Sequence, residues 1–221
     1  MAEGTRTPRI FVLAGTNGAG KSSIGGAMLL ESGGEFFNPD DAARRILSRN
    51  PGISQTDANS AAWYEGKRLL ERAIADKLDY AFETTLGGKT IASLLQQALS
   101  EGIEVRIWYV GLEGAELHIE RVRSRVAHGG HDIPEHRIRE RYKQSRLNLI
   151  ELLPKLTELM LYDNSEEADP KAGAAPRPKL ILHLLRGKIV ASSDLNRVPE
   201  WAKSIVLAAL RLSVGSELRV P

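Results

Sequence analysis

Residues 15–22 have the spacing with the clearest chemical meaning, because they read GTNGAGKS and match the pattern G-x-x-x-x-G-K-[S/T]. In this pattern the glycines let backbone N–H groups curl around phosphates, Lys21 reaches the β- and γ-phosphates, and the Ser22 hydroxyl binds Mg²⁺. The alternative is a Gly-rich turn with no ligand, but the segment also lies between an apolar strand and a helical pattern, as a phosphate loop requires. The residues expected to hold the nucleotide are Gly15, Thr16, Asn17, Gly18, Ala19, Gly20, Lys21, Ser22 and Ser23.

The acidic pair Asp40 and Asp41 follows a short apolar segment and the dipeptide Asn38-Pro39. Small-molecule kinases place a carboxylate at the end of the second strand, where it faces the γ-phosphate and accepts or orients the proton of the substrate hydroxyl. Asp40 is in that position, and we expect it to act as the catalytic base, a substrate contact and a Mg²⁺ ligand. The alternative is that Asp40 or Asp41 only caps the next helix.

Glu83, Thr84 and Thr85 lie at the C-terminal end of a predicted parallel strand, where open α/β sheets bind their ligands. A carboxylate followed by two hydroxyls suits a polyhydroxyl substrate or the shell around Mg²⁺. The alternative is a solvated strand end in which a threonine caps the following segment.

A basic segment between residues 121 and 146 carries eight Arg or Lys side chains against three acidic ones. Two predicted helices with arginines four residues apart flank a Gly-Gly hinge at 129–132, which is typical of a kinase lid that neutralises the transferred phosphoryl group. A solvated helix face is the alternative, and RNA binding is disfavoured because no aromatic residues are interleaved with the charges. The candidate phosphate-contacting residues are Arg125 and Arg141 as catalytic groups, Arg121 as a substrate contact, and Arg137 and Arg139 as further possibilities.

The class of phosphate-loop protein follows from which other motifs are present. A GTPase would carry an Asn-Lys-x-Asp signature, which this sequence lacks, so ATP is favoured. ATPase motors usually have an apolar strand that ends in Asp, whereas the strand at 105–111 is followed by Leu-Glu. These observations favour a small-molecule kinase. A nucleotide-hydrolysing switch module and a kinase for nucleosides or RNA ends are the alternatives.

The elements that must position these residues alternate between short apolar runs and helical patterns, which predicts an α/β fold with a mostly parallel sheet. Strands are expected at 9–14, 35–37, 80–84, 105–111 and 158–162, with a β-hairpin at 179–185 and 188–191. Helices are expected at 21–31, after Asp41, from Thr56 or Asp57 to 77, and at 89–100, 115–128, 134–153 and 199–212. We predict one P-loop kinase domain over 1–221, with lid-like helices at about 115–153 and a C-terminal hairpin and helix at about 178–213.

The composition limits the chemistry further. The chain has no cysteine, which excludes disulfides, thiolate catalysis and cysteine-ligated metal centres. A net charge of +2 is too small for a general nucleic-acid or membrane binder. The longest apolar runs are too short to span a membrane, and glycines interrupt the first one. We therefore expect a cytoplasmic protein.

The ordered motifs GTNGAGKS, NPDDAAR, FETTL, RVxxRVxxGGHxIPExxIxxRY and LYDNS resemble those of the zeta-toxin family of P-loop kinases, especially its shorter members. The resemblance runs from about residue 9 to 165. Asn38 departs from it, because the family usually has a first Asp there.

The resemblance implies transfer of the ATP γ-phosphate to the 3′-hydroxyl of the sugar in UDP-N-acetylglucosamine, with Mg²⁺. It implies that Asp40 is the base, that Glu83 and Thr85 contact the substrate, and that Arg125 with Arg139 or Arg141 stabilises the phosphates. It places Asn164, with its two preceding residues, near the nucleotide base. A small helical antitoxin is a typical partner in that family.

Overall fold

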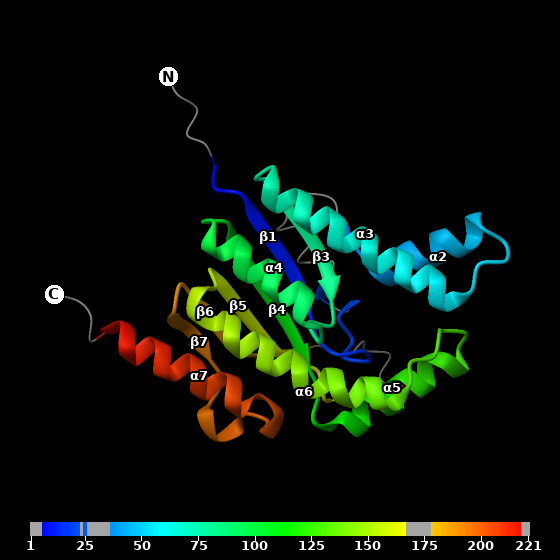
Figure 1. The fold of residues 1–221 in the computed structure, drawn as a ribbon. Coiled ribbons are helices and arrows are strands. Elements are labelled where there is room, and N and C mark those ends of the chain that lie inside the picture. The colour runs from blue at the N-terminus through cyan, green and yellow to red at the C-terminus, as the bar shows by residue number, and fades with distance from the viewer. Residues whose placement is uncertain (1–5, 23, 26–35, 167–177, 218–221) are drawn as a thin grey trace.

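The strands expected from the sequence join into one sheet (Figure 1). The computed structural model describes residues 6–22, 24–25, 36–166 and 178–217. The strands are β1 (Arg9–Ala14), β2 (Phe36–Phe37), β3 (Tyr80–Thr84), β4 (Glu104–Gly111), β5 (Glu158–Asp163), β6 (Lys179–Leu185) and β7 (Lys188–Ser192). Their order is β2-β3-β1-β4-β5-β6-β7. The first five are parallel and the last two antiparallel, which confirms the predicted α/β class and its C-terminal hairpin.

The helices agree with the predicted ranges to within a few residues, except where the chain is not described. They are α2 (Pro39–Arg49), α3 (Gln55–Ala75), α4 (Lys89–Ser100), α5 (Gly114–Ala127), α6 (Glu135–Leu152) and α7 (Glu200–Glu217), with short 3₁₀ turns at Leu153–Lys155 and Leu195–Arg197. The helix expected at 21–31 lies mostly outside the described residues, although Ser22, Ile24 and Gly25 are helical. The polar segment at 165–178, whose composition is typical of a surface loop, also lies mostly outside them.

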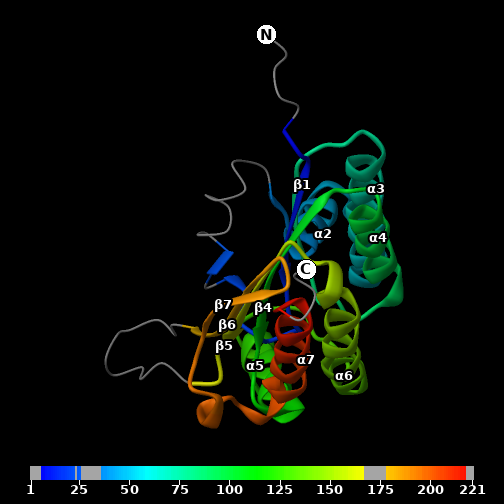
Figure 2. The same ribbon diagram turned by 90° about the vertical axis from the view of Figure 1, so that its left-hand side faces the viewer.

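Apolar side chains are buried on both faces of the sheet, as a parallel sheet requires. Helices α3, α4, α6 and α7 lie along one face (Figure 2). Ile10 and Val12 of β1 point into the large core cluster that these helices cover. Phe11 and Leu13 alternate with them and join a smaller cluster with Trp108 on the other face.

One predicted helix start is wrong. Neither Thr56 nor Asp57 caps α3, because Ser54 is the N-cap, and its hydroxyl accepts a hydrogen bond from the Asp57 amide at 3.1 Å. The Asp57 carboxylate in turn accepts from the Ser54 hydroxyl at 2.7 Å. Both side chains therefore serve the same capping turn, and the sequence alone does not rank Ser54 above its neighbours.

The carboxyl ends of the central strands meet at one edge of the sheet. Ala14, the last residue of β1, is in register with Thr84 of β3 and Tyr109 of β4. The amide of Gly15 then donates to the carbonyl of Thr84 at 3.2 Å. The phosphate-loop segment and the Glu83-Thr84-Thr85 segment are thus neighbours, as expected for ligand-binding loops at this edge.

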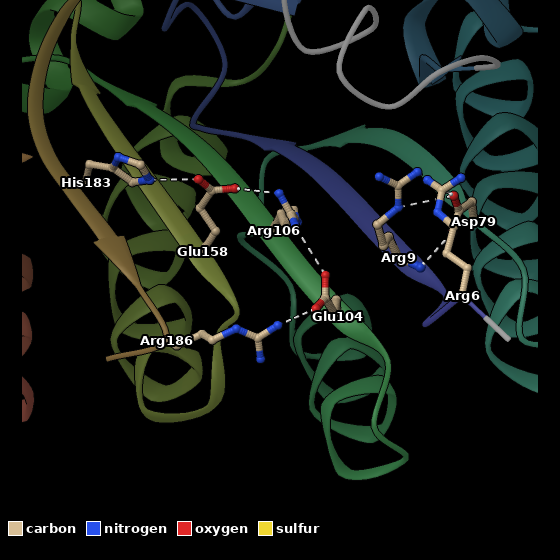
Figure 3. A network of polar contacts seen from close by, with 8 residues as sticks. All are labelled: Arg6, Arg9, Asp79, Glu104, Arg106, Glu158, His183 and Arg186. Atoms are coloured by element: carbon tan, nitrogen blue, oxygen red, sulfur yellow. Dashed lines mark hydrogen bonds and ion pairs between the residues drawn. The ribbon is translucent and has the colours of Figure 1, made fainter. Parts of the chain in front are cut away.

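The opposite edge of the sheet carries a network of charged side chains (Figure 3). Glu158 accepts from Arg106 at 3.3 Å and contacts His183 of β6 at 2.7 Å. Arg106 also donates to Glu104 at 3.2 Å, and Glu104 pairs with Arg186. Because its members come from β4, β5, β6 and the turn after β6, the network links the antiparallel hairpin to the parallel strands.

Helix α7 is locked onto the sheet by Trp201. Its indole Nε1 donates to the Asp163 carboxylate at 2.9 Å, and its ring packs on Tyr109 and against Gly111. A Cβ at Gly111 would lie within 3.0 Å of the Trp201 ring. No helix in the described parts of the chain is long and apolar enough to cross a lipid bilayer.

This packing predicts that Gly111→Ala destabilises the fold by about 1–3 kcal/mol, because the added methyl overpacks a site that Trp201 already fills. The free energy of unfolding from urea denaturation measures the effect. Gly215→Ala is the matched control, because a Cβ there meets no atom within 4 Å. An unchanged unfolding midpoint for Gly111→Ala would show that Trp201 does not pack as described.

Candidate active site

At three of its glycines, the phosphate loop packs closely against other parts of the chain. Gly15, Gly18 and Gly20 have φ values of 146°, 81° and 78°, a region that side chains disfavour. A Cβ on them would lie within 3.0 Å of the Val110 carbonyl, the His118 carbonyl and the Asn164 amide, respectively. The loop therefore needs glycine at these positions both for its conformation and for its close contacts.

Lys21 is buried, and its ammonium group turns back toward the start of the loop. Its Nζ donates to the Gly15 carbonyl at 2.9 Å and lies 3.4 Å from a Glu83 carboxylate oxygen. This position suits a group that reaches the β- and γ-phosphates. Ser22 is exposed and helical, whereas the predicted nucleotide contact at Ser23 lies outside the described residues.

Asn38, which was expected only as a departure from the zeta-toxin pattern, organises the start of α2. We call this segment, with Asp40 and Asp41, the acidic corner. The Oδ1 of Asn38 accepts from the amides of Asp40 and Asp41 at 2.8 and 3.2 Å, so Asn38 is the N-cap of α2. The alternative in which Asp40 or Asp41 caps this helix is therefore wrong. The Asn38 amide also donates to Glu83 at 3.2 Å, which connects the corner to the end of β3.

The two adjacent carboxylates have different surroundings. Asp41 pairs with Arg44 on the exposed side of α2. The half-exposed Asp40 faces the basic segment instead, with its Oδ2 3.9 Å from Nη1 of Arg125. Of the two carboxylates, Asp40 is thus the one that lies beside a predicted phosphate-contacting arginine.

The five candidate arginines divide into two groups. Arg141 donates to the Asn17 side chain at 2.7 Å, and Nη1 of Arg121 lies 4.0 Å from where a Cβ on Gly20 would be. With Arg125, these side chains lie at the loop and the acidic corner. Arg137 and Arg139 instead pair with glutamates on the exposed surface.

Burial lowers the pKa of the Arg141 guanidinium from its usual value, and the charge of Arg137 adds to this shift. The group remains a cation, because an arginine guanidinium is not deprotonated in proteins. The aliphatic part of Arg141 packs on Gly87, where a Cβ would lie within 3.0 Å of its Cγ. Arg141 is therefore a cation held at partial burial between two loops.

The loop after β3 is held in a conformation that costs energy. Leu86 is buried with φ of 52°, although leucine disfavours this region. The Thr84 hydroxyl accepts from the Leu86 amide at 3.0 Å and the Thr85 hydroxyl from the Gly87 amide at 3.4 Å, so both threonines support the turn, and both remain partly accessible, as does Glu83. Strain of this kind persists only where surrounding contacts enforce it.

Those contacts come from two residues of α6 that the sequence analysis missed. Asn148 donates to the carbonyls of Leu86 and Gly88 at 2.8 and 3.3 Å. Ser145 donates to the carbonyl of Thr85 at 2.7 Å and shares a contact with the Tyr109 hydroxyl. The only signal in the sequence is that both polar residues lie on the apolar face of a helix, and this signal gives no indication of their partners.

His118 of α5 is a further residue that sequence reasoning missed. It is buried, and its Nδ1 donates to the Asn17 carbonyl at 2.8 Å, which places the proton of the neutral ring on Nδ1. Burial lowers its pKa to about 4, and the nearby Lys21 and Arg121 charges contribute to the shift. His118 thus fixes the loop to the basic segment as a neutral side chain.

The Gly-Gly segment predicted as a hinge closes helix α5. Gly129 has φ of 89°, its amide donates to the Val126 carbonyl at 2.9 Å, and the Gly130 amide donates to the Arg125 carbonyl at 3.0 Å. These are the paired bonds of a Schellman motif. A small apolar cluster that includes Ile119 and Ile138 packs α5 and α6 together. Movement at this hinge stays a prediction.

Asn164 supports the far end of the loop. It is buried, and its Nδ2 donates to the Ala19 carbonyl at 2.9 Å. Its expected position near the nucleotide base stays a prediction.

The oxygen-bearing side chains at the site are of the kind that bind Mg²⁺ together with ATP phosphates. The described residues contain no group of three or more His, Cys, Asp or Glu that could hold a metal ion. Mg²⁺ characteristically binds through one or two protein oxygens plus substrate phosphates. Ser22 and Asp40 would be those protein ligands, and the glycine-lined loop would hold the phosphates.

The sequence is similar to a family model and to a known protein sequence. The family model described as an AAA domain (AAA_33) matches residues 10–146. An uncharacterized protein of Haemophilus influenzae is 30% identical over 128 residues, which cover 58% of this chain and 88% of that protein.

Several solved structures are similar at low sequence identity, and three of them are compared below. A chain of the AvrRxo1-ORF1:-ORF2 structure with ATP has a TM-score of 0.64 at 16% identity, over 93% of this chain and 64% of that one. A putative kinase from Chloroflexus aurantiacus has a TM-score of 0.53 at 16% identity, over 76% of this chain and 95% of that one. A chain from the PezAT chromosomal toxin–antitoxin system of Streptococcus pneumoniae has a TM-score of 0.52 at 18% identity, over 72% of this chain and 68% of that one.

These likenesses extend over most of the chain, from the phosphate loop through the sheet. The chain belongs to the AAA domain family (AAA_33), and its α/β fold with a phosphate loop is similar to the folds of these three solved structures.

Proposed function

We propose that the protein is a Mg²⁺- and ATP-dependent phosphotransferase that phosphorylates a hydroxyl group of a small substrate. The observation that carries this proposal is the position of Asp40. Its carboxylate lies 3.9 Å from Arg125. The neighbouring Asn38 donates to Glu83, and Glu83 lies 3.4 Å from Lys21. A chain of contacts thus joins Arg125 and the proposed base to Lys21, the proposed phosphate-binding cation.

In the proposed reaction, the substrate hydroxyl oxygen attacks the γ-phosphorus and the bond from that phosphorus to the β-phosphate oxygen breaks. Asp40 accepts the hydroxyl proton, and the products are ADP and a phosphate monoester. Lys21, Arg125 and Arg141 stabilise the charge on the transferred group. Mg²⁺, when bound, neutralises charge on the β- and γ-phosphates.

Glu83 and Thr85 are the proposed substrate contacts. Glu83 lies between the Asn38 amide and Lys21, so one of its sides is oriented by hydrogen bonding and the other by charge. Thr85 belongs to the loop that Ser145 and Asn148 hold in place. A rigid carboxylate and hydroxyl suit recognition of a polyhydroxyl compound, because buried polar groups discriminate strongly against analogues without the matching hydroxyl.

UDP-N-acetylglucosamine is the acceptor that we propose, on the basis of the resemblance to zeta toxins. The fold shared with a chain of the PezAT toxin–antitoxin system and with a putative kinase supports a toxin-like kinase, and the fold shared with a structure that holds ATP supports nucleotide binding. A small antitoxin chain is accordingly a proposed partner.

Asp40→Asn should abolish phosphoryl transfer, because the amide cannot accept the hydroxyl proton, while ATP binding stays within about threefold of wild type. The measurement is mass spectrometry of UDP-N-acetylglucosamine after incubation with protein and MgATP. Asp41→Asn is the matched control, since Asp41 pairs with Arg44 on the exposed side of the same helix.

Full transfer by Asp40→Asn would exclude Asp40 as the base. Formation of ADP without phosphorylation of the sugar nucleotide indicates either another acceptor or a hydrolase. Repeating the reaction with a metabolite extract separates these outcomes, because only a kinase yields a new phosphate ester.

Lys21→Ala should weaken MgATP binding by about 10- to 100-fold, since it removes charge-assisted hydrogen bonds to the phosphates. Isothermal titration calorimetry measures the dissociation constant. Lys203→Ala, on the surface of α7, should leave it unchanged. Equal affinity of the wild type and Lys21→Ala would argue against phosphate binding at this loop.

Arg141→Ala should lower kcat by about 100-fold or more, as expected for an arginine that stabilises the transferred phosphoryl group. Arg139→Ala is the matched control two residues away on α6, because Arg139 pairs with Glu116 at the surface. Its kcat should stay within about twofold of wild type. Equal losses in the two variants would show that the charge of the segment matters and the position of Arg141 does not.

A further inference from the structure

Asn17 of the phosphate loop is contacted from both helices of the basic segment. Its side-chain Oδ1 accepts from Nη1 of Arg141 on α6 at 2.7 Å. Its backbone carbonyl accepts from Nδ1 of His118 on α5 at 2.8 Å. The general phosphate-loop pattern leaves this position unspecified, so the pattern does not explain why an amide side chain is here.

The position of Asn17 along the loop indicates which phosphate it is near. The ammonium of Lys21, the group that reaches the β- and γ-phosphates, lies at the Gly15 carbonyl, two residues before Asn17. Arg121 and Asn164 lie at the other end of the loop, beside Gly20. Asn17 and the guanidinium bound to it are therefore at the end that receives the terminal phosphate.

Arg141 is immobilised in a way that leaves it able to bind a ligand. Its aliphatic part packs on Gly87, and one of its guanidinium nitrogens is engaged by Asn17. Since a guanidinium has five N–H donors, Asn17 and a phosphate oxygen can be bound at the same time. The entropy of ordering this side chain is then lost on folding and does not oppose nucleotide binding.

We propose that Asn17 is a positioning residue that holds Arg141 beside the terminal phosphate and thereby makes the site prefer a nucleoside triphosphate over the diphosphate. This inference rests on the proposed nucleotide-binding function. It assigns the preference to an amide in the loop acting through a lid arginine, in addition to the direct contact by Lys21.

The side chain of Asn17 can be removed without disturbing its other contact. The bond to His118 uses the backbone carbonyl, which alanine retains. Asn17 is half-buried and is not among the residues with positive φ, so alanine fits its backbone conformation. Asn17→Ala therefore isolates the contact to Arg141.

The test measures dissociation constants for MgADP and for a Mg²⁺ complex of the non-hydrolysable ATP analogue with a β–γ imido bridge. Calorimetry is applied to the wild type, Asn17→Ala, Arg141→Ala and the double variant. We expect Asn17→Ala to reduce the preference for the triphosphate by about tenfold, the size of one hydrogen bond to a charged group. Arg141→Ala should reduce it at least as much, and the double variant should resemble Arg141→Ala.

That lack of additivity distinguishes positioning from a separate structural role, since independent contributions would add. Asn59→Ala is the matched control, because Asn59 is also half-buried and its side chain accepts a hydrogen bond from Gln55 on α3 at 2.9 Å. An unchanged preference in Asn17→Ala, or additive losses in the double variant, would overturn the proposal. A wild-type protein that binds neither nucleotide would overturn the proposed function as well, so the two failures are distinguishable.

Discussion

Steric exclusion at the phosphate loop is the constraint on which the candidate site depends. At Gly15, Gly18 and Gly20 the backbone lies so close to β4, α5 and the segment after β5 that no Cβ could be accommodated. The loop can therefore face a ligand only if these three neighbours are in place. Since the neighbours come from sequence positions far apart, the loop acquires its shape only when the sheet and the basic segment have assembled around it.

Helix α6 connects the parts of the site. Near its middle it presents Arg141 to the loop, and one turn later Ser145 and Asn148 hold the strained turn at Leu86. Beyond them, Leu149 and Leu152 belong to the main core. The predicted lid at 115–153 thus includes a half that is packed into the core. Closure of the lid would involve α5 and the first turns of α6, while the rest stays with the sheet.

Residues with a local signature were predictable from the sequence. The phosphate loop, the β-strands and the general position of Asp40 follow from motif, alternation and apolar runs, and the structure places them together. Ser54 and Asn38 as helix caps were not predicted, because several neighbouring residues have similar capping ability. Ser145, Asn148 and His118 escaped prediction because their partners are distant in sequence. The inward orientation of Arg141 and the outward orientation of Arg139 depend on the exact rotation of α6, which charge spacing does not determine.

The charged network at the amino-terminal edge of the sheet has an evolutionary consequence. Glu104, Arg106, Glu158 and His183 join the hairpin to the parallel strands at the end opposite the phosphate loop. Substitutions there act on fold stability, whereas substitutions at the carboxyl edge act on ligand chemistry. Lineages can therefore exchange one set of the proposed acceptor-binding residues for another while this edge maintains the scaffold. Such a separation allows one architecture to diversify its substrates by changes confined to a few loops.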